Sequence, residues 1–390
     1  MSLIKIKEKL KIYSEFLQAR RTGNIFALFI VLAFGFLSLI RLYPFANTLK
    51  DYLNDIDDWS TYARYALDIM HNGISMPSIN ENYWAPAGFL YAYFIAFNFY
   101  LFGENDVPVF IIQNILLGFS VLFIYLTFRD KMKPLTSIAF LFTLFLFALV
   151  DVSKYYSFRL LSENLALFTM SAFFYCFING MEKNKWSQQI IASVLLGLSV
   201  LIRPNILPFA LLIIVIAYFY YRKAGIHKLF LFMLFLMMSS SLLAIRNYYV
   251  TGSIVFLPTL GISFGNQLFS HQDFSLVTFL NKIIFLFGFL TPLEPHYQWR
   301  PHWTMMWIGY FVYLFFRLRE NKWFKIWEVT SHLYIFCYFS LLIFIPPQLG
   351  SYGFRLLIPA IYFVLPFAFM ALDKFGKINT DSQVFSNARL

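Results

Sequence analysis

The sequence has little charge and few cysteines for its length. Only 13% of its 390 residues are charged, whereas 59% are hydrophobic and 21% are aromatic. The two cysteines, Cys176 and Cys337, both fall inside apolar runs, so the chain has no disulfide framework and no CxxC site. It also lacks a P-loop, a dinucleotide-binding glycine pattern and a GxSxG motif. A nucleotide-dependent reaction therefore has no support.

Long apolar runs dominate the sequence instead, and the mean hydropathy is +0.64. Runs of about 17–22 residues match the hydrocarbon thickness of a bilayer. They are continuous rather than alternating, which argues against a β-barrel. The sequence therefore predicts an all-α polytopic membrane protein. Its apolar segments lie near residues 25–43, 88–102, 107–128, 135–150, 162–180, 187–203, 205–221, 229–249, 276–290, 303–317, 328–346 and 355–372.

Basic residues are grouped into six short clusters between these segments. The net charge is +11, and the clusters hold 21 of the 31 lysines and arginines. Lysine and arginine mark cytoplasmic loops, so we interpret this charge as a topology signal and a contact with lipid headgroups, not with nucleic acid. The clusters lie at residues 5–21, 129–133, 183–185, 222–228, 317–325 and 374–389.

The orientation follows from these clusters. Residues 1–24 form a basic cytoplasmic segment leading into an uncleaved anchor, 25–372 form the transmembrane domain, and 373–390 form a cytoplasmic tail. Two apolar segments, 88–102 and 107–128, separate the external start of this domain from the cytoplasmic cluster at 129–133, but a chain that passes from outside to inside crosses an odd number of times. We therefore expect 107–128 to cross and 88–102 to be interfacial, within an external loop at 44–106. Segment 276–290 lies between two external stretches, so we expect it to be interfacial or re-entrant as well. About ten spans remain, with both termini inside.

The densest acidic stretch is DIDDWSTYARYALDIM, residues 55–70, on the predicted external face. Residues 57–71 have the apolar spacing of an amphipathic helix, and Gly73 suits a C-terminal cap. Asp57 and Asp58 stand at its N-terminus, where the helix dipole favours a carboxylate. One of them is explained by N-capping alone, but three acids in four positions (Asp55, Asp57 and Asp58) exceed that need.

Further charged residues interrupt apolar runs on the same face. Glu163 begins a span, and Arg159 precedes it at a spacing that would allow a mutual ion pair. Arg203, Arg246 and Arg355 each lie near the end of a span. Snorkelling to headgroups explains any one of them. Several that converge would instead form a phosphate site.

Two other stretches are candidate sites. The segment 82–88, NYWAPAG, places Trp84 at the start of the interfacial segment, where an aromatic belt explains it equally well. The segment 290–303 contains Glu294, His296 and His302. An acid and two histidines are potential metal ligands, but their spacing fits no standard motif. A divalent metal therefore stays an alternative, and no cofactor is required.

Taken in order, these residues resemble the GT-C glycosyltransferases over residues 25–370. The resemblance rests on D-x-x-x-Y at Asp58 and Tyr62, LFG at 101–103, SEN-L at 162–165, RP at 203–204, RN-Y at 246–248 and Arg355 with Pro359. The most similar branch comprises the bacterial protein mannosyltransferase-like and lipid A aminoarabinose transferase-like enzymes. The soluble C-terminal domain of larger members has no counterpart in this sequence.

The resemblance implies a function on the external face of a bacterial cytoplasmic membrane. A sugar would move from a polyprenyl-phosphate donor to a glycan, lipid or protein acceptor with inversion. Asp58, or Asp57, would act as base, and Glu163 would be a second acid. Trp59 follows Asp58 where the family often has another acid. The donor phosphate would be bound by Arg246 and Arg355, and also by Arg203 and Arg159. Substrate-lining positions are Asp55, Tyr62, Trp84, His296 and Tyr352.

Three other functions remain open at this stage. A lipid-linked glycan transporter or flippase would place ionisable residues near the midplane, often in repeated halves, whereas here the acids lie at the surface. An O-antigen polymerase-like or ligase-like enzyme relies on external arginines without an early acidic loop. A non-catalytic interaction protein needs neither feature. The acidic loop thus distinguishes the transferase from all three.

Overall fold

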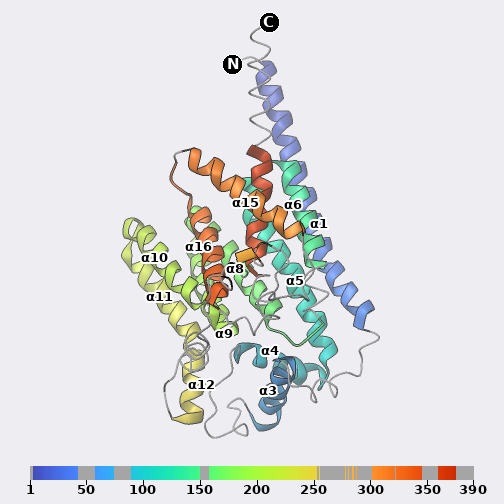
Figure 1. Ribbon diagram of the computed structural model, residues 1–390, viewed down its shortest axis with the longest axis vertical. Helices are drawn as coiled ribbons and strands as arrows, with labels where there is room; N and C mark the ends of the chain where they lie inside the picture. Colours follow the sequence, from blue (N-terminus) through green and yellow to red (C-terminus); the bar gives the residue numbers. More distant parts are fainter. Residues whose placement is uncertain are drawn as a thin grey trace.

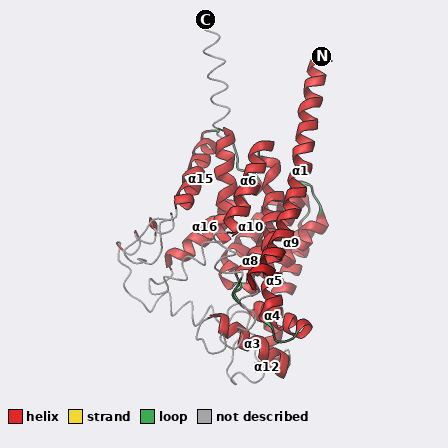
Figure 2. Ribbon diagram, turned by 90° about the vertical axis from the view of Figure 1, so that its right-hand side faces the viewer, coloured by secondary structure: helices red, strands yellow, loops and turns green. Residues whose placement is uncertain are grey.

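The computed structural model describes residues 3–42, 58–73, 89–149, 158–252, 254, 301–320, 322–344, 359–374 and five residues between 277 and 287. Every regular element in these ranges is helical (Figures 1 and 2). The helices of the main bundle are α1 Leu3–Leu42, α5 Asp106–Phe128, α6 Pro134–Phe147, α8 Glu163–Glu182, α9 Trp186–Ile202, α10 Leu207–Ala224, α11 Ile226–Ser240, α15 Pro301–Arg319 and α16 Ile326–Phe344, followed by a final helical segment at 359–374.

Five helical stretches are long and apolar enough to cross a bilayer: Thr22–Arg41, Asp106–Lys131, Glu163–Glu182, Pro204–Arg222 and Ile226–Tyr249. Shorter apolar helices occur at Leu90–Phe102, Pro134–Phe147 and Trp186–Ile202. The expected all-α membrane bundle is therefore confirmed. The count of about ten spans and the domain boundaries stay predictions, and the second interfacial segment at 276–290 falls almost entirely outside the described residues.

The described residues of the five basic clusters after residue 128 lie at one end of the bundle, where polar contacts link them and their neighbours. Lys131 is paired with Glu182 at 2.6 Å, and Lys374 with Glu320 at 2.6 Å. The backbone N–H of Lys133 donates to Asp373 at 2.7 Å. In two further contacts, Arg129 donates to Asn24 just after the first cluster, and Lys228 donates to Asn184. This shared end is what the charge pattern predicts for loops on one side of a membrane.

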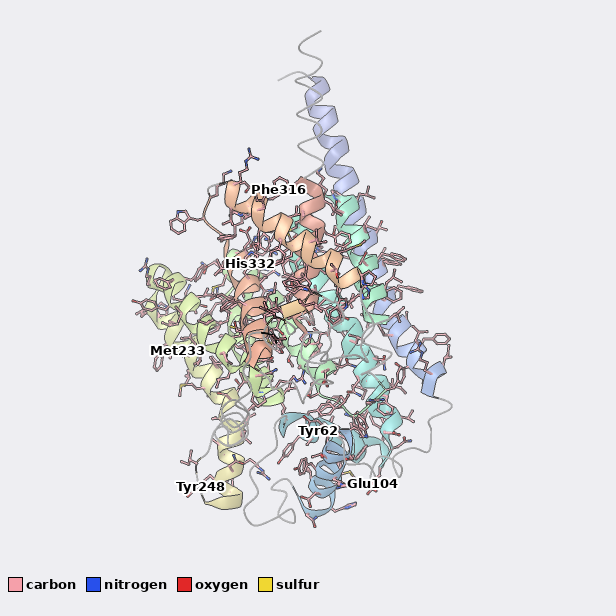
Figure 3. All side chains as sticks on the ribbon, viewed as in Figure 1. Tyr62, Glu104, Met233, Tyr248, Phe316 and His332 are labelled. Carbon is pink, nitrogen blue, oxygen red and sulfur yellow. The ribbon has the colours of Figure 1, made fainter. Side chains whose placement is uncertain are left out.

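Three short helices gather at the opposite end: α3 Asp58–Asn72, α4 Phe89–Phe102 and α12 Leu242–Thr251 (Figures 1 and 2). Figure 3 shows Tyr62, Glu104 and Tyr248 at this end and Phe316 at the other. At 1.5 Å per residue, the 14 residues of α4 extend only about 21 Å, less than the roughly 30 Å of a bilayer core. Because α6 also has 14 residues, length alone does not distinguish the two helices, and the interfacial position of α4 stays a prediction.

The apolar run 229–249 is divided by a break at Ser241 into α11 and α12. Three consecutive serines, Ser239, Ser240 and Ser241, donate their hydroxyls to main-chain carbonyls one turn earlier. Such bonds compete with the helical ladder and bend helices. Beyond the break, α12 continues toward the end of the bundle that holds α4, where Leu90 packs against the cluster of Leu201 and Leu243 (Figure 1). It thereby positions Arg246.

A close contact between α1 and α5 depends on Gly118. A Cβ built there would lie 2.8 Å from the Cα of Val31, whereas one at Gly35 in the same interface would lie 3.5 Å from the nearest atom, on Ile115. Small residues allow such approach between membrane helices.

We expect Gly118→Ala to lower the free energy of unfolding by about 1–3 kcal/mol, measured by thermal unfolding in detergent. Gly35→Ala is the matched control and should not destabilise; equal effects would contradict this account.

Candidate functional site at the acid-rich end

The structure describes only part of the predicted site. Asp58 is the first residue of α3, and its side chain lies outside the described residues. Tyr62, Arg159, Glu163, Arg203, Arg246 and His302 are described in full. Asp55, Asp57, Trp84, Glu294, His296, Tyr352 and Arg355 lie outside the described residues, so their assigned roles stay predictions.

The helix α3 has the amphipathic pattern that its sequence predicts. Ala63, Ala66 and Ile69 are buried, and the ring of Tyr62 meets that of Tyr91 of α4 edge to face, with centroids 5.0 Å apart. The helix ends at Gly73, which has φ +95° and donates its N–H to Ile69. This left-handed conformation is one that glycine adopts at little cost. The expected helix over 57–71 with its glycine cap is thus confirmed to within one residue.

The end of α3 is fixed to the segment after α4. The Nε2 atom of His71 lies 2.6 Å from the Glu104 carboxylate. Within the helix, Asn72 donates to the carboxylate of Asp68, which is 7% exposed. Together with the buried alanine face, these contacts give α3 one orientation against α4. They therefore also fix the direction in which its N-terminus, at Asp58, points.

The N-terminus of α3 lies against the segment that precedes α8. The guanidinium of Arg159 sits 4.6 Å from the ring centroid of Trp59, the residue after Asp58. Cation–π contacts of this kind contribute about 0.5–1 kcal/mol when exposed and about 2 when desolvated. The contact brings the start of α3 to the segment that carries both Arg159 and Glu163.

Two consecutive hydrogen bonds, made by buried side chains, hold the main chain of Arg159, in the segment that precedes α8. The hydroxyl of Tyr91 donates to Gln113 Oε1 at 2.8 Å, and Gln113 Nε2 donates to the main-chain oxygen of Arg159 at 3.1 Å. Tyr91 and Gln113 are both fully buried. Gln113 is absent from the residues that the sequence pattern indicates, although a glutamine inside an apolar run requires partners in the bundle.

We expect Tyr91→Phe to remove this support. The buried Oε1 of Gln113 would lose its donor, which costs about 1–3 kcal/mol of stability, and the position of Arg159 would loosen. Thermal unfolding of the purified protein measures the effect. Tyr100→Phe is the matched control, because Tyr100 lies on the same helix and is 80% exposed. Equal unfolding temperatures for both variants would contradict the prediction.

Glu163 forms a buried ion pair with Arg203. The distance from Nη2 to Oε1 is 3.1 Å, and the side chains are 11% and 1% exposed for Arg203 and Glu163. Glu163 stands in the first turn of α8, where the helix dipole stabilises a carboxylate. Arg203 is extended, at φ −142° and ψ 100°, where α9 stops before Pro204. The spacing had suggested Arg159 as a partner of Glu163, but the side chain of Arg159 lies on Trp59.

Two tyrosines of α16 complete the surroundings of Arg203. Tyr334 and Tyr338 are at most 1% exposed, their ring centroids are 4.8 Å apart, and both lie within electrostatic range of Arg203. The two hydroxyls lie close enough to hydrogen-bond each other, whereas Nη1 of Arg203 has no hydrogen-bond partner within the described part of the chain. Buried polar groups are normally satisfied, so Nη1 of Arg203 suits a ligand with an acceptor oxygen.

Arg246 lies on α12, close to α4. Its side chain is buried at 6% exposure, donates to Asn247 at 3.0 Å, and is hydrogen-bonded to the side chain of Tyr93. Asp68 of α3 also acts electrostatically on Tyr93. Arg246 is therefore held at the end of the bundle where α3 lies.

The described residues contain no group of three or more histidines, cysteines and acids that could hold a metal ion. Of the three weak metal candidates, only His302 is described. It lies in the first turn of α15, with its ring 6.4 Å from the rings of Phe147 and Trp303. Glu294 and His296 lie outside the described residues, and metal dependence stays untested.

Comparisons with known proteins agree with this architecture. The model of the dolichyl-phosphate-mannose–protein mannosyltransferase family matches residues 86–249. The crystal structure of ArnT from Cupriavidus metallidurans bound to undecaprenyl phosphate superimposes with a TM-score of 0.59 at 13% identity, covering 93% of this chain and 63% of that one. A search of curated protein sequences gives no match.

A second enzyme class shows the same fold. The oligosaccharyltransferase of Archaeoglobus fulgidus in its apo form gives a TM-score of 0.51 at 12% identity, covering 93% of this chain and 52% of that one. The chain thus spans about half to less than two thirds of the length of these solved proteins. The GT-C type fold and the resemblance to the GT-C superfamily are confirmed.

Proposed function

We propose that this chain, with its GT-C fold, is an integral membrane glycosyltransferase that moves a sugar from a polyprenyl-phosphate donor to an acceptor hydroxyl. The observation that carries the proposal is the docking of α3: the residue after Asp58 contacts Arg159, in the segment that leads to Glu163 and Arg203. Asp58, which we assign as the general base, thus begins a helix at the end of the bundle where Arg159 and Arg203 lie. The undecaprenyl phosphate in the ArnT structure supports the class of donor.

In the proposed reaction, Asp58 takes the proton from the acceptor hydroxyl. The acceptor oxygen attacks C1 of the sugar as the bond from C1 to the phosphate oxygen breaks. The phosphate keeps the electron pair and leaves as polyprenyl phosphate. Because base and leaving group lie on opposite faces of the sugar, the product is inverted. A glycan, a lipid and a protein are all acceptor classes that this chemistry permits.

Fixed positive charge would stabilise the leaving phosphate. Arg246 is buried, Arg203 is largely so, and both are held by protein contacts, so they need not reorganise during the reaction. Nη1 of Arg203, which has no hydrogen-bond partner among the described residues, supplies a further donor, and the hydrogen-bonded pair Tyr334 and Tyr338 has one hydroxyl hydrogen left to donate. Arg355 is assigned to the same role by the sequence. Glu163 is already paired with Arg203, so we assign it to positioning that guanidinium, not to proton transfer.

Purified protein incubated with a panel of polyprenyl-phosphate sugars tests this proposal. We expect release of free polyprenyl phosphate with one donor, dependent on acceptor. Movement of a labelled lipid-linked glycan across a vesicle membrane, without release of polyprenyl phosphate from any donor, would favour the flippase instead and would contradict the transferase. We also propose that the site lies on the external face of the bacterial cytoplasmic membrane. Labelling of a cysteine introduced near α3 by a membrane-impermeant thiol reagent in intact cells tests this orientation.

A further inference from the structure

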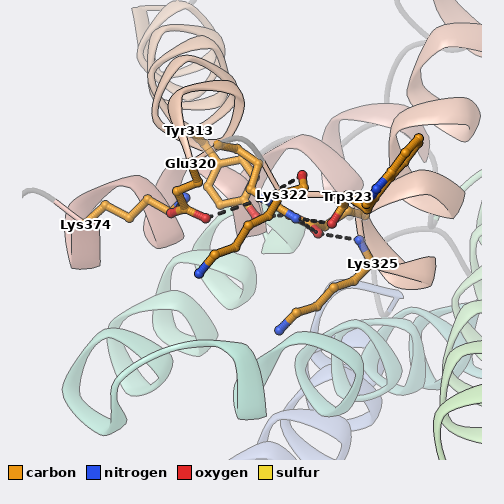
Figure 4. A network of polar contacts seen from close by, with 8 residues as sticks. Tyr313, Glu320, Lys322, Trp323, Lys325 and Lys374 are labelled. Atoms are coloured by element: carbon orange, nitrogen blue, oxygen red, sulfur yellow. Dashed lines mark hydrogen bonds and ion pairs between the residues drawn. The ribbon is translucent and has the colours of Figure 1, made fainter.

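The turn between α15 and α16 presents the most exposed large hydrophobic side chain in the described part of the protein. Trp323 is 95% exposed, and its neighbours Lys322 and Lys325 are exposed as well (Figure 4). The turn lies at the end of the bundle where the basic clusters meet, opposite α3. A fully exposed indole is costly in water, since burying a large apolar side chain contributes roughly 1.5–3 kcal/mol. The exposure therefore points to a non-aqueous surrounding.

The turn is held rigidly by a buried arginine. Arg317 donates to the carboxylate of Glu328 at 2.7 Å and 3.2 Å, to the carbonyl of Lys322 at 3.1 Å and to that of Trp323 at 2.5 Å. The N–H of Lys325 donates to the same carboxylate at 2.7 Å. The main chain on both sides of Trp323 is thus fixed, and the indole is directed outwards by a built structure (Figure 4).

The exposed face of α15 shows where lipid would lie. Ile308, Phe311, Phe315 and Leu318 recur at helical spacing and are 49–66% exposed, whereas Trp307, Tyr310 and Tyr313 face inwards. Such an apolar outer stripe is expected against acyl chains. It stops at Arg319, so the turn that follows stands at the level of the headgroups. Tryptophan is enriched at this level of a membrane.

The free charge of the turn is positive. Its acid, Glu320, is paired with Lys374 at 2.6 Å and with Arg317 at 3.4 Å. The hydrogen bond from Lys374 holds the pKa of Glu320 below its usual range. Within the described residues, the side chains of Arg319, Lys322 and Lys325 form no ion pair. Three cations thus surround an exposed indole.

We propose that this turn, Arg319, Lys322, Trp323 and Lys325, is a binding site for anionic phospholipid headgroups in the leaflet at the basic end of the bundle. The indole inserts between headgroups and acyl chains, and the three cations contact lipid phosphates. Each such cation adds about 1 kcal/mol of attraction near an anionic surface. The site is independent of the proposed transfer reaction, which takes place at the opposite end.

Fluorescence in nanodiscs tests where Trp323 lies. The emission of wild type minus that of Trp323→Phe isolates this indole, because Phe preserves an exposed aromatic ring. We expect a blue-shifted difference spectrum that lipids brominated near the headgroup quench at least twofold, and more strongly than lipids brominated near the chain end. A difference spectrum that brominated lipids do not quench would overturn the proposal. An unquenched spectrum at the wavelength of indole in water would show that the turn faces solvent. An unquenched but blue-shifted spectrum would show that the turn contacts another protein surface.

Titration of phosphatidylglycerol into the detergent-solubilised protein, followed by native mass spectrometry, tests the charge. Lys322→Gln/Lys325→Gln should weaken binding by about tenfold or more. Lys183→Gln/Lys185→Gln is the matched control, since it removes two exposed lysines beside Trp186, which packs against the core. Equal losses in the two double variants would overturn a specific site, as would no loss in the first.

Discussion

Replacing Asp58 by asparagine should lower the rate of sugar transfer by about a thousandfold, within the range of about 10²–10⁴ that general bases contribute. Asn keeps the size and the hydrogen-bonding oxygen of Asp but cannot accept the acceptor proton. Asp58 is the first residue of α3, where losing a carboxylate costs only about 0.3–1 kcal/mol of helix stability, so the start of α3 should remain folded. The initial rate of polyprenyl phosphate release measures the loss, and an unchanged unfolding temperature shows that the protein is folded.

Asp57→Asn is the matched control for this experiment. It stands one residue earlier, carries the same charge and precedes the first residue of α3. If Asp58 is the base, Asp57→Asn should reduce the rate less than tenfold. A larger loss at Asp57 than at Asp58 would move the base by one position and leave the mechanism intact. Full activity in both single variants and in the double variant would contradict the proposed mechanism.

The helices were the part that the sequence predicted best, because long apolar runs indicate helices that lie in a bilayer. Each apolar run before residue 229 corresponds to a helix whose ends agree within about three residues, except that α1 continues back through the basic segment to Leu3. The run 229–249 lies, as predicted, within one stretch long enough to span a bilayer, Ile226–Tyr249, but serine hydroxyls at 239–241 divide this stretch into two helices. Such a break depends on local hydrogen bonds, which hydropathy does not record.

The pairing of charges was the part that spacing could not predict. Arg159 and Glu163 are four residues apart, but α8 begins only at Glu163, so the helical spacing rule does not apply to them. The partner found by Glu163, Arg203, is 40 residues away at the end of α9. Contacts of this kind depend on how helices pack. The involvement of Tyr334 and Tyr338 follows from the same packing, and both looked like ordinary aromatic residues of a span.

The buried ion pair between Glu163 and Arg203 leads to the second large expected effect. Removing one partner leaves the other charge uncompensated at a site that is almost closed to solvent. We therefore expect Glu163→Gln and Arg203→Gln each to lower the free energy of unfolding by about 3–5 kcal/mol. Thermal unfolding in a mild detergent measures both variants under the same conditions. Lys131→Gln, which breaks an ion pair at the other end of the bundle, is the control and should cost about 1 kcal/mol or less.

The double variant Glu163→Gln/Arg203→Gln separates stability from function. Two neutral amides can hydrogen-bond each other, so it should recover most of the stability that either single variant loses. Sugar transfer should nevertheless stay low, because the guanidinium that faces the two tyrosines is gone. Recovery of both properties would make the pair purely structural and remove Arg203 from the phosphate site. Losses in stability that simply add would show that the two residues do not interact, contrary to their 3.1 Å contact.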